Sequence, residues 1–301
     1  MINRSPRKNK LKEAIISAIL CIAVFAAAFA LSNIDLSSSG WSFSNFDTED
    51  DFVRIIDVGQ GDSILIYSNG YSALIDTGLS DSSAEVCTAL ESCDIDKLDV
   101  LLITHLDSDH TGSVGTVTEI YGADNLILPE ISVESEGLNE AHLAMENVAE
   151  NGGNIYTAVQ GMNFNIGEFE LTVLAAFPEM KSENDRSVIT VAEIDGIKFL
   201  LMGDIESKAE NALLKENLDL KCDVLKVGHH GSATSSKEKF LKAVRPRYAA
   251  ISVGKDNGFG HPHSEVLSTL EYIGAKLYRT DLDGDITFYV ENKKIIPKTE
   301  K

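Results

Sequence analysis

Residues 104–112 read THLDSDHTG, and this stretch decides how the chain is interpreted. It follows an apolar run, Val100–Thr104, which predicts a buried β-strand. The spacing allows a tight loop to turn His105 and Asp107 toward one point, with Asp109 and His110 toward a neighbouring one. Imidazole and carboxylate groups at an open site are the ligands that a hydrolytic Zn²⁺ or Mn²⁺ prefers. The sequence therefore predicts a metal site at the end of this strand.

Three more clusters of polar side chains follow predicted strands. They are LLMGD at 200–204, KVGHHGS at 226–232 and GFGHPH at 258–263. Taken alone, Asp204 is either a ligand or the cap of a helix that begins near Ile205. Six of the seven histidines occupy three strand-to-loop transitions, which favours one site supplied by several strands.

The order of predicted elements indicates an α+β fold with two sheets and helices outside them, more than a single doubly wound sheet. Apolar runs predict strands at 53–57, 63–67, 72–76, 100–104, 168–177, 187–194, 198–202, 224–227, 248–253, 277–279 and 285–290. Helical periodicity predicts helices at 83–92, 138–151, 205–217, 237–243 and 264–273.

The first 32 residues are interpreted as an export signal. Basic residues precede an uncharged apolar run at 14–31, which suits either a cleaved signal peptide or a transmembrane anchor, and a buried core helix less well. A Ser-rich and acidic linker is expected at 33–51, and one domain at 52–301, which would lie outside the cytoplasm. Cys87 and Cys93 are either small buried thiols or an exported pair.

The charge of the chain limits its partners. There are 47 acidic against 26 basic residues, a formal net charge of −21, and the first twelve residues hold five of the bases and no acid. The remaining acidic body should repel polyanions and anionic membranes unless a cation is bound to it. With 44% hydrophobic residues, the chain is not a disordered one.

These motifs together carry a family resemblance. HLDSDH at 105–110 resembles the metal motif of the metallo-β-lactamase fold superfamily. DVGQGD at 57–62, LIDTG at 74–78, Gly203-Asp204, HHGS at 229–232 and GHPH at 260–263 resemble one branch of it. That branch is the extracellular hydrolase domain of ComEC-type competence proteins, which take up DNA, and its free-standing relatives. The resemblance runs from about Val53 to Val290, and it implies a free-standing relative because the many membrane spans of ComEC are absent.

The resemblance implies an αββα sandwich with two divalent metal ions, Zn²⁺ or Mn²⁺, along one edge. By position, His105 and Asp107 would bind one ion, Asp109 and His110 the other, and Asp204 would bridge them. His263, in preference to His261, would complete the second ion, and Asp76 would orient ligands from beneath. The histidine that the wider superfamily has between its main motif and the bridging aspartate has no clear counterpart, since His142 lies in a predicted surface helix.

The expected activity is hydrolysis of an anionic phosphate ester by metal-activated water, with DNA among the candidate substrates. Asp109 or Asp204 would take a proton from water. His229 or His230, with Lys226, would steady the developing charge or protonate the leaving oxygen, and Ser232 would donate to phosphate. The alternatives are a small-ester hydrolase, such as a phosphocholine esterase, lactonase or β-lactamase, and a metal-binding surface module without turnover.

Overall fold

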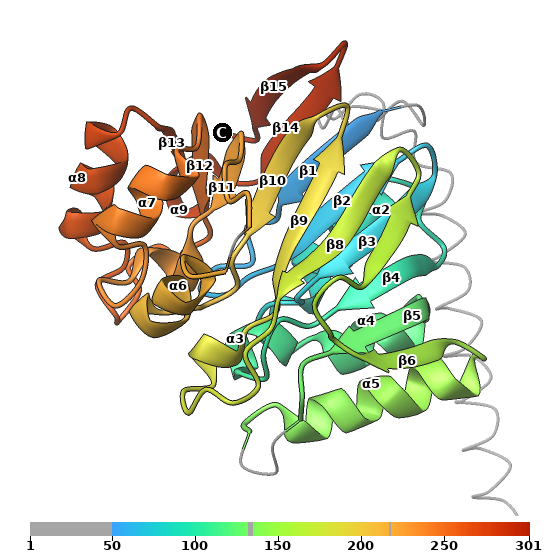
Figure 1. Ribbon diagram of the computed structural model, residues 1–301. Helices are drawn as coiled ribbons and strands as arrows, with labels where there is room; N and C mark the ends of the chain where they lie inside the picture. The colour runs from blue at the N-terminus through green and yellow to red at the C-terminus, as the bar shows by residue number, and fades with distance from the viewer. Residues whose placement is uncertain (1–49, 132–134, 217) are drawn as a thin grey trace, which may run out of the picture. The chain divides into compact units, whose positions relative to one another are not determined.

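Two β-sheets stack face to face in the computed structural model, which describes residues 50–131, 135–216 and 218–301 (Figure 1). Within those residues one sheet has eight strands, in the order β15 (Lys294–Thr299), β14 (Ile286–Glu291), β1 (Asp51–Ile55), β2 (Ile64–Ser68), β3 (Tyr71–Ile75), β4 (Leu98–Leu102), β5 (Ala123–Leu128) and β6 (Asn154–Thr157). The other described sheet has seven, in the order β13 (Lys276–Arg279), β12 (Tyr248–Ile251), β11 (Val224–Lys226), β10 (Ile197–Leu201), β9 (Ile189–Ile194), β8 (Phe169–Ala175) and β7 (Asn163–Ile166).

Helices cover the outer face of each sheet. On the first sheet these are α2 (Ser83–Glu91), α4 (Val114–Ile120) and α5 (Leu138–Glu150). On the second they are α6 (Ser207–Leu213), α7 (Glu238–Val244) and α8 (Ser264–Tyr272), which Figure 1 shows on the opposite side of the molecule from α4 and α5. The remaining short helical turns are α3 (Ser108–Thr111), α9 (Thr280–Asp283), η2 (Asn184–Arg186) and η3 (Gly228–Gly231).

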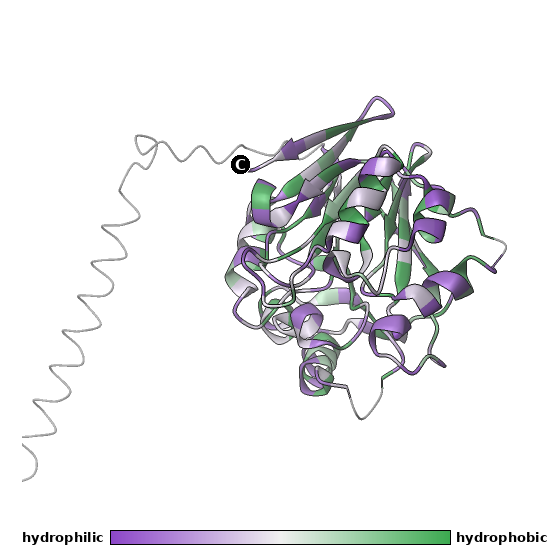
Figure 2. Cartoon of the chain, turned by 90° about the vertical axis from the view of Figure 1, so that its left-hand side faces the viewer, coloured by the Kyte–Doolittle hydropathy of each residue, from purple (hydrophilic) through white to green (hydrophobic). Residues whose placement is uncertain are grey.

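The main hydrophobic core lies between the sheets. The rings of Phe169, Phe199 and Phe288 meet there, with centroids 6.0 and 6.4 Å apart. Strand β8 alternates buried and more exposed positions, as a strand with one face in the core should, whereas β2 is buried throughout because helices cover its other face. In Figure 2 hydrophobic residues accordingly concentrate on the strands, and hydrophilic ones on turns and outer helix faces.

This architecture confirms the predicted two-sheet α+β sandwich. Sequence patterns did not predict β5, β6, β7, β15 or α4. The helix expected at 205–217 is shorter, and Glu206 is its N-cap residue, so the alternative in which Asp204 only caps it is wrong. The carboxylate of Asp204 instead faces two histidines.

Two expectations concern the ends of the chain and its thiols. The predicted signal or anchor at 1–32, and all but the last two residues of the linker, lie outside the described residues. Among described helices, none has the length and apolarity to cross a membrane. Cys87, Cys93 and Cys222 are free in the structure, so Cys87 and Cys93 do not pair; of these two, Cys93 is buried and Cys87 is partly exposed.

Strand direction sets the place of the site. Strands β3, β4 and β5 are parallel to one another, and so are β10, β11, β12 and β13. Parallel neighbours end at the same edge of a sheet, so the residues that follow them gather there. Asp76 follows β3, His105 follows β4, Asp204 follows β10 and His230 follows β11.

Candidate metal centre

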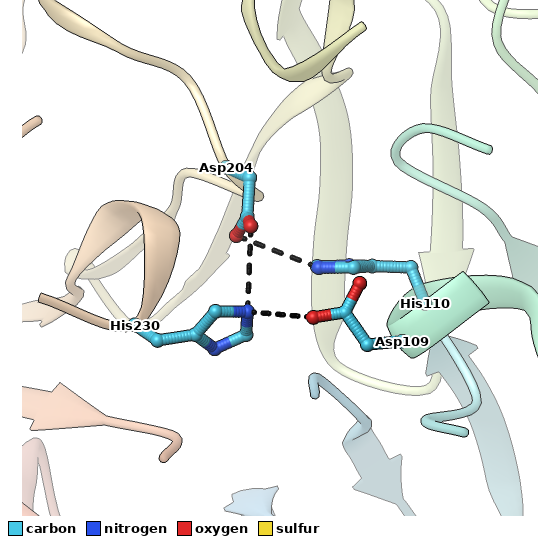
Figure 3. A group of neighbouring side chains, drawn as sticks. All are labelled: Asp109, His110, Asp204 and His230. Atoms are coloured by element: carbon cyan, nitrogen blue, oxygen red, sulfur yellow. Dashed lines mark ion pairs between the residues drawn. The ribbon is translucent and has the colours of Figure 1, made fainter. Parts of the chain in front are cut away.

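Four side chains converge where the carboxyl ends of these strands meet. Single ligand atoms of Asp109, His110, Asp204 and His230 all lie within 4.8 Å of one another. In Figure 3 Nε2 of His230 points at carboxylates of both aspartates, 3.2 Å from Oδ2 of Asp109 and 3.3 Å from Oδ2 of Asp204. Nε2 of His110 lies 3.5 Å from the other oxygen of Asp204. Segments far apart in the sequence thus supply one compact group.

Asp76 fixes the orientation of His110. Its Oδ2 lies 2.7 Å from Nδ1 of His110 and also accepts a hydrogen bond from the hydroxyl of Thr104. Its Oδ1 accepts from the backbone N–H of Thr104. A carboxylate on Nδ1 assigns the ring proton to that nitrogen and leaves the Nε2 lone pair toward Asp204. Asp76 therefore occupies the orienting place that the resemblance implies.

His230 is held in the same way by the other sheet. Its Nδ1 lies 2.9 Å from the backbone carbonyl of Ser252 and 3.4 Å from Oδ1 of Asp62. Both are acceptors, so Nδ1 carries the proton and Nε2 is left as an acceptor facing Asp109 and Asp204. Asp62 and Ser252 were not predicted as site residues. Asp62 ends the quoted DVGQGD motif, so its position in that motif was the available signal.

The backbone is strained where these side chains are aimed. Asp76, His229 and His230 have φ values of 60°, 50° and 51°, a left-handed region that non-glycine residues rarely adopt. Such conformations cost on the order of 1–3 kcal/mol each and persist where surrounding contacts impose them. At position 61 the requirement for glycine is steric, because a Cβ there would lie 2.4 Å from the carbonyl oxygen of Asp109.

The charges of the group are strongly coupled. Burial opposes ionisation of all four residues, yet the carboxylates of Asp204 and Asp76 raise the pKa of His110 well above its usual value. Asp204, with Asp109 and Asp62, raises the pKa of His230 to about 10. In return the two histidines hold the pKa of Asp204 well below its usual range, and that of Asp109 at about 2. The ionised carboxylates of Asp109 and Asp204 therefore favour a positive charge at this point of the structure.

The donor set fits a divalent cation. Nε2 of His110, Nε2 of His230 and Oδ1 of Asp204 are buried and have no hydrogen-bond partner. When the imidazoles are neutral, with both Nδ1 protons donated elsewhere, the converging atoms are all acceptors, and a divalent cation among them can replace the protons that the carboxylates otherwise hold on the two rings. Nitrogen and oxygen ligands of this kind suit Zn²⁺ or Mn²⁺.

His105 and Asp107 form a second pair beside this group. Nε2 of His105 is buried without a hydrogen-bond partner and lies 3.6 Å from Oδ2 of Asp107. The ring of His105 lies 4.1 Å from that of His110. These are the two residues expected to hold a second ion, and no third imidazole or carboxylate joins them within the described groups of metal-competent residues.

The histidines of the GHPH motif lie outside the four-residue group, which contains His230, and the assignment of His263 as a ligand stays a prediction. Nδ1 of His263 accepts from the backbone N–H of Ala233. The ring of His261 instead lies almost parallel to that of His230, at 25° and 6.4 Å. Burial and the neighbouring His229, His230 and His263 lower the pKa of His261 to about 4.

The remaining predicted catalytic residues have contrasting positions. His229 is partly exposed, with Nε2 3.9 Å from Oδ2 of Asp204 and 3.5 Å from Nδ2 of Asn184. Lys226 is fully buried, and its Nζ donates to Oδ2 of Asp62 at 2.6 Å and to the carbonyl of Val227. Ser232 is buried and bonds to Thr234. Lys226 and Ser232 thus both have protein partners in this structure, and their contacts with substrate stay predictions.

Glu210 on α6 supports the loop that follows His230. Its carboxylate accepts hydrogen bonds from the backbone N–H groups of Ser236 and Lys237. Burial raises its pKa to about 7, against those hydrogen bonds and the charge of Lys237, and Asp185 raises it further. A carboxyl whose folded pKa exceeds its ordinary 4.5 binds its proton more tightly when folded.

The free energy of unfolding is therefore expected to fall as pH rises from about 4.5 to about 7, by roughly 3 kcal/mol from this group. Glu210→Gln cannot ionise and should flatten that part of the pH profile, while costing about 1–3 kcal/mol for one unsatisfied N–H. Urea midpoints at pH 5 and pH 7.5 test this. Equal pH dependence in both proteins would contradict the role of Glu210.

Similarity to known proteins supports a metal site independently of this geometry. Residues 56–255 match the model of the metallo-beta-lactamase superfamily. The chain belongs to the metallo-β-lactamase superfamily. Among solved structures, the metallo-β-lactamase fold protein YhfI from Bacillus subtilis has a TM-score of 0.52 at 12% identity, covering 79% of this chain and 99% of that one. CmlA from Streptomyces venezuelae, a diiron β-hydroxylase, has a TM-score of 0.54 at 12% identity, covering 79% and 54%. These structures share the fold of the superfamily.

Curated relatives are nearer in sequence. ComE operon protein 3 of Bacillus subtilis (strain 168) is 33% identical over 261 residues, which is 80% of this chain and 33% of that protein. Competence protein ComA of Neisseria gonorrhoeae is 31% identical over 238 residues, or 78% and 32%. The chain thus spans about a third of the length of these relatives. The resemblance to ComEC-type competence hydrolases is confirmed, within a superfamily of metal-dependent hydrolases.

Proposed function

We propose that this protein is a metal-dependent phosphodiesterase that acts outside the cytoplasm. The observation that carries the proposal is the convergence of ligand atoms from Asp109, His110, Asp204 and His230, the last three of which are buried, in an arrangement that a divalent cation would satisfy. We propose that these four residues would hold one Zn²⁺ or Mn²⁺ and that His105 and Asp107 would hold a second. The export signal interpreted in residues 1–32 supports the location.

Bound divalent metal supplies hydroxide at neutral pH and charge for phosphoryl oxygens. The chain's own residues do the rest. Asp76 and Ser252 hold the two imidazoles with Nε2 toward the site, so little reorganisation is needed when substrate arrives. Asp109 is partly exposed and can accept a proton from water. His229, partly exposed beside Asp204, is positioned to protonate the leaving oxygen.

The basic residues near the site favour recognition of a single phosphate ester over extended binding along DNA. Of the bases between 226 and 247, Lys226 is buried against Asp62, and Lys242 pairs with Glu238. Lys237 donates to the carbonyl of Ala233, and Arg247 lies over the ring of Tyr248. Binding of long DNA depends on many phosphate contacts with free cations. We therefore propose that the enzyme recognises the ester near the scissile bond, with single-stranded DNA among its candidate substrates.

The purified chain is expected to hydrolyse bis(p-nitrophenyl) phosphate with added Mn²⁺ or Zn²⁺ and to lose this activity in a chelator. A panel containing a phosphodiester, single-stranded DNA, a phosphocholine ester, a lactone and a β-lactam decides the substrate class. Cleavage of lactones or β-lactams without any phosphodiester would favour the small-ester alternative. Metal analysis that finds no transition metal after loading would contradict every enzymatic interpretation.

A further inference from the structure

An exposed aromatic ring on the loop before α8 contacts His261, whose own ring contacts a residue of the metal group. Phe259 is 68% exposed, although a phenylalanine in water loses the benefit of burial. Its ring lies almost parallel to that of His261, at 23° and 5.7 Å. His261 is in turn nearly parallel to His230, at 25° and 6.4 Å. His261 is therefore in ring contact both with the exposed Phe259 and with His230, a residue of the metal group.

The loop holds this ring in place. Oδ1 of Asn257 accepts from the backbone N–H groups of Phe259 and His261, and its Nδ2 donates to the carbonyls of His261 and Gly254. One side chain thus fixes both ends of the segment that carries Phe259. Rigid placement of an aromatic ring lowers the entropy lost when a ligand stacks on it.

The ring of Phe259 is mostly exposed, and its one ring contact within the described residues is with His261. The exposed surface is therefore available to a planar group. Stacking on an aromatic ring tolerates any base and does not depend on a cationic surface. That matters here, because the net charge of −21 opposes recognition through phosphates.

We propose that Phe259, backed by His261, is a stacking platform for a nucleobase of the substrate, so that the enzyme prefers nucleotide phosphodiesters to simple alkyl ones. This inference rests on the proposed phosphodiesterase function and specifies its substrate class. The base stacks on Phe259 while the ester phosphate reaches the metal group, to which Phe259 is connected through His261. Phe259 is thus a specificity-determining residue.

The test compares two esters with the same leaving group on the full chain loaded with Mn²⁺. Thymidine 5′-(p-nitrophenyl phosphate) carries a base, and methyl p-nitrophenyl phosphate does not. The wild type should favour the nucleoside ester in kcat/KM by roughly 5- to 150-fold, mainly through KM. Phe259→Ala should remove most of that ratio and Phe259→Tyr should retain it. Tyr272→Ala, which alters a similarly exposed ring on α8, should leave the ratio unchanged.

A binding measurement separates this inference from the proposed activity. Fluorescence anisotropy compares a thymidine oligonucleotide with an abasic one of equal phosphate number on the metal-loaded chain. Tighter binding of the base-bearing strand, lost in Phe259→Ala, supports the platform even without turnover. Hydrolysis of both esters at equal efficiency, or equal binding of both strands, overturns the platform and leaves the phosphodiesterase standing. Absence of phosphodiester hydrolysis with base-dependent binding overturns the activity alone.

Discussion

His230→Ala is expected to lose tight metal binding and to reduce phosphodiester hydrolysis by at least about 100-fold. The substitution removes the Nε2 that faces both Asp109 and Asp204, and so leaves the buried carboxylate of Asp204 and the partly exposed one of Asp109 without their shared partner. Even residues that only orient a metal ligand typically contribute 10- to 100-fold, and a ligand contributes more. Metal content after dialysis and kcat/KM with bis(p-nitrophenyl) phosphate measure the two effects.

His263→Ala is the matched control for this experiment. His263 lies in the neighbouring motif, but its Nδ1 accepts a backbone N–H and it stands outside the four-residue group. We expect His263→Ala to keep its metal and most of its activity. If His263→Ala lost the metal while His230→Ala retained it, the ligand set taken from the resemblance would replace the one assigned from geometry. Circular dichroism of both variants verifies that they remain folded.

Lys226→Met is expected to lower the free energy of unfolding by about 3–5 kcal/mol, the usual cost of breaking a buried ion pair. The ammonium of Lys226 and the carboxylate of Asp62 are fully buried and 2.6 Å apart. Removing the lysine leaves a buried negative charge without its partner. That charge also lies 3.4 Å from Nδ1 of His230, so metal affinity should change as well.

Two controls show whether the charge of Asp62 is responsible. The double variant Asp62→Leu with Lys226→Met replaces both charges by apolar groups and should recover part of the loss. Lys97→Met breaks the exposed pair with Asp124 and should cost less than about 1 kcal/mol. Urea unfolding followed by circular dichroism measures all of these. A loss in Lys226→Met no larger than that in Lys97→Met would contradict the buried-pair assignment.

Local sequence patterns predicted much of the fold and part of the site. The apolar runs located most central strands, because strands covered on both faces show as short continuous hydrophobic segments. The main motif at 105–110 placed four of its six residues at or beside the centre, because one tight turn holds them in sequence order. Peripheral strands such as β6, which is mostly exposed, gave no comparable signal.

Residues brought together from distant segments were less predictable. Asp62 and Lys226 are 164 positions apart, and each alone has the pattern of a polar residue near a strand end. Sequence patterns could not separate His230 from His263 for the same reason. Both residues follow strands on the same sheet edge, and only packing shows which imidazole reaches Asp204. The stack of Phe259 on His261 depends on the path of one loop fixed by Asn257.

The sequence by itself determined the two-sheet class, the edge at which the site lies and the metal-competent character of its residues. These follow from hydrophobic periodicity and from polar side chains placed after strands, which are properties of neighbouring residues. Only the tertiary structure decided that His230 completes the group, that Lys226 is buried against Asp62 and that an exposed aromatic ring contacts His261. The physical reason is that orientation, burial and partner choice depend on contacts between distant segments, and those contacts exist only once both sheets are packed.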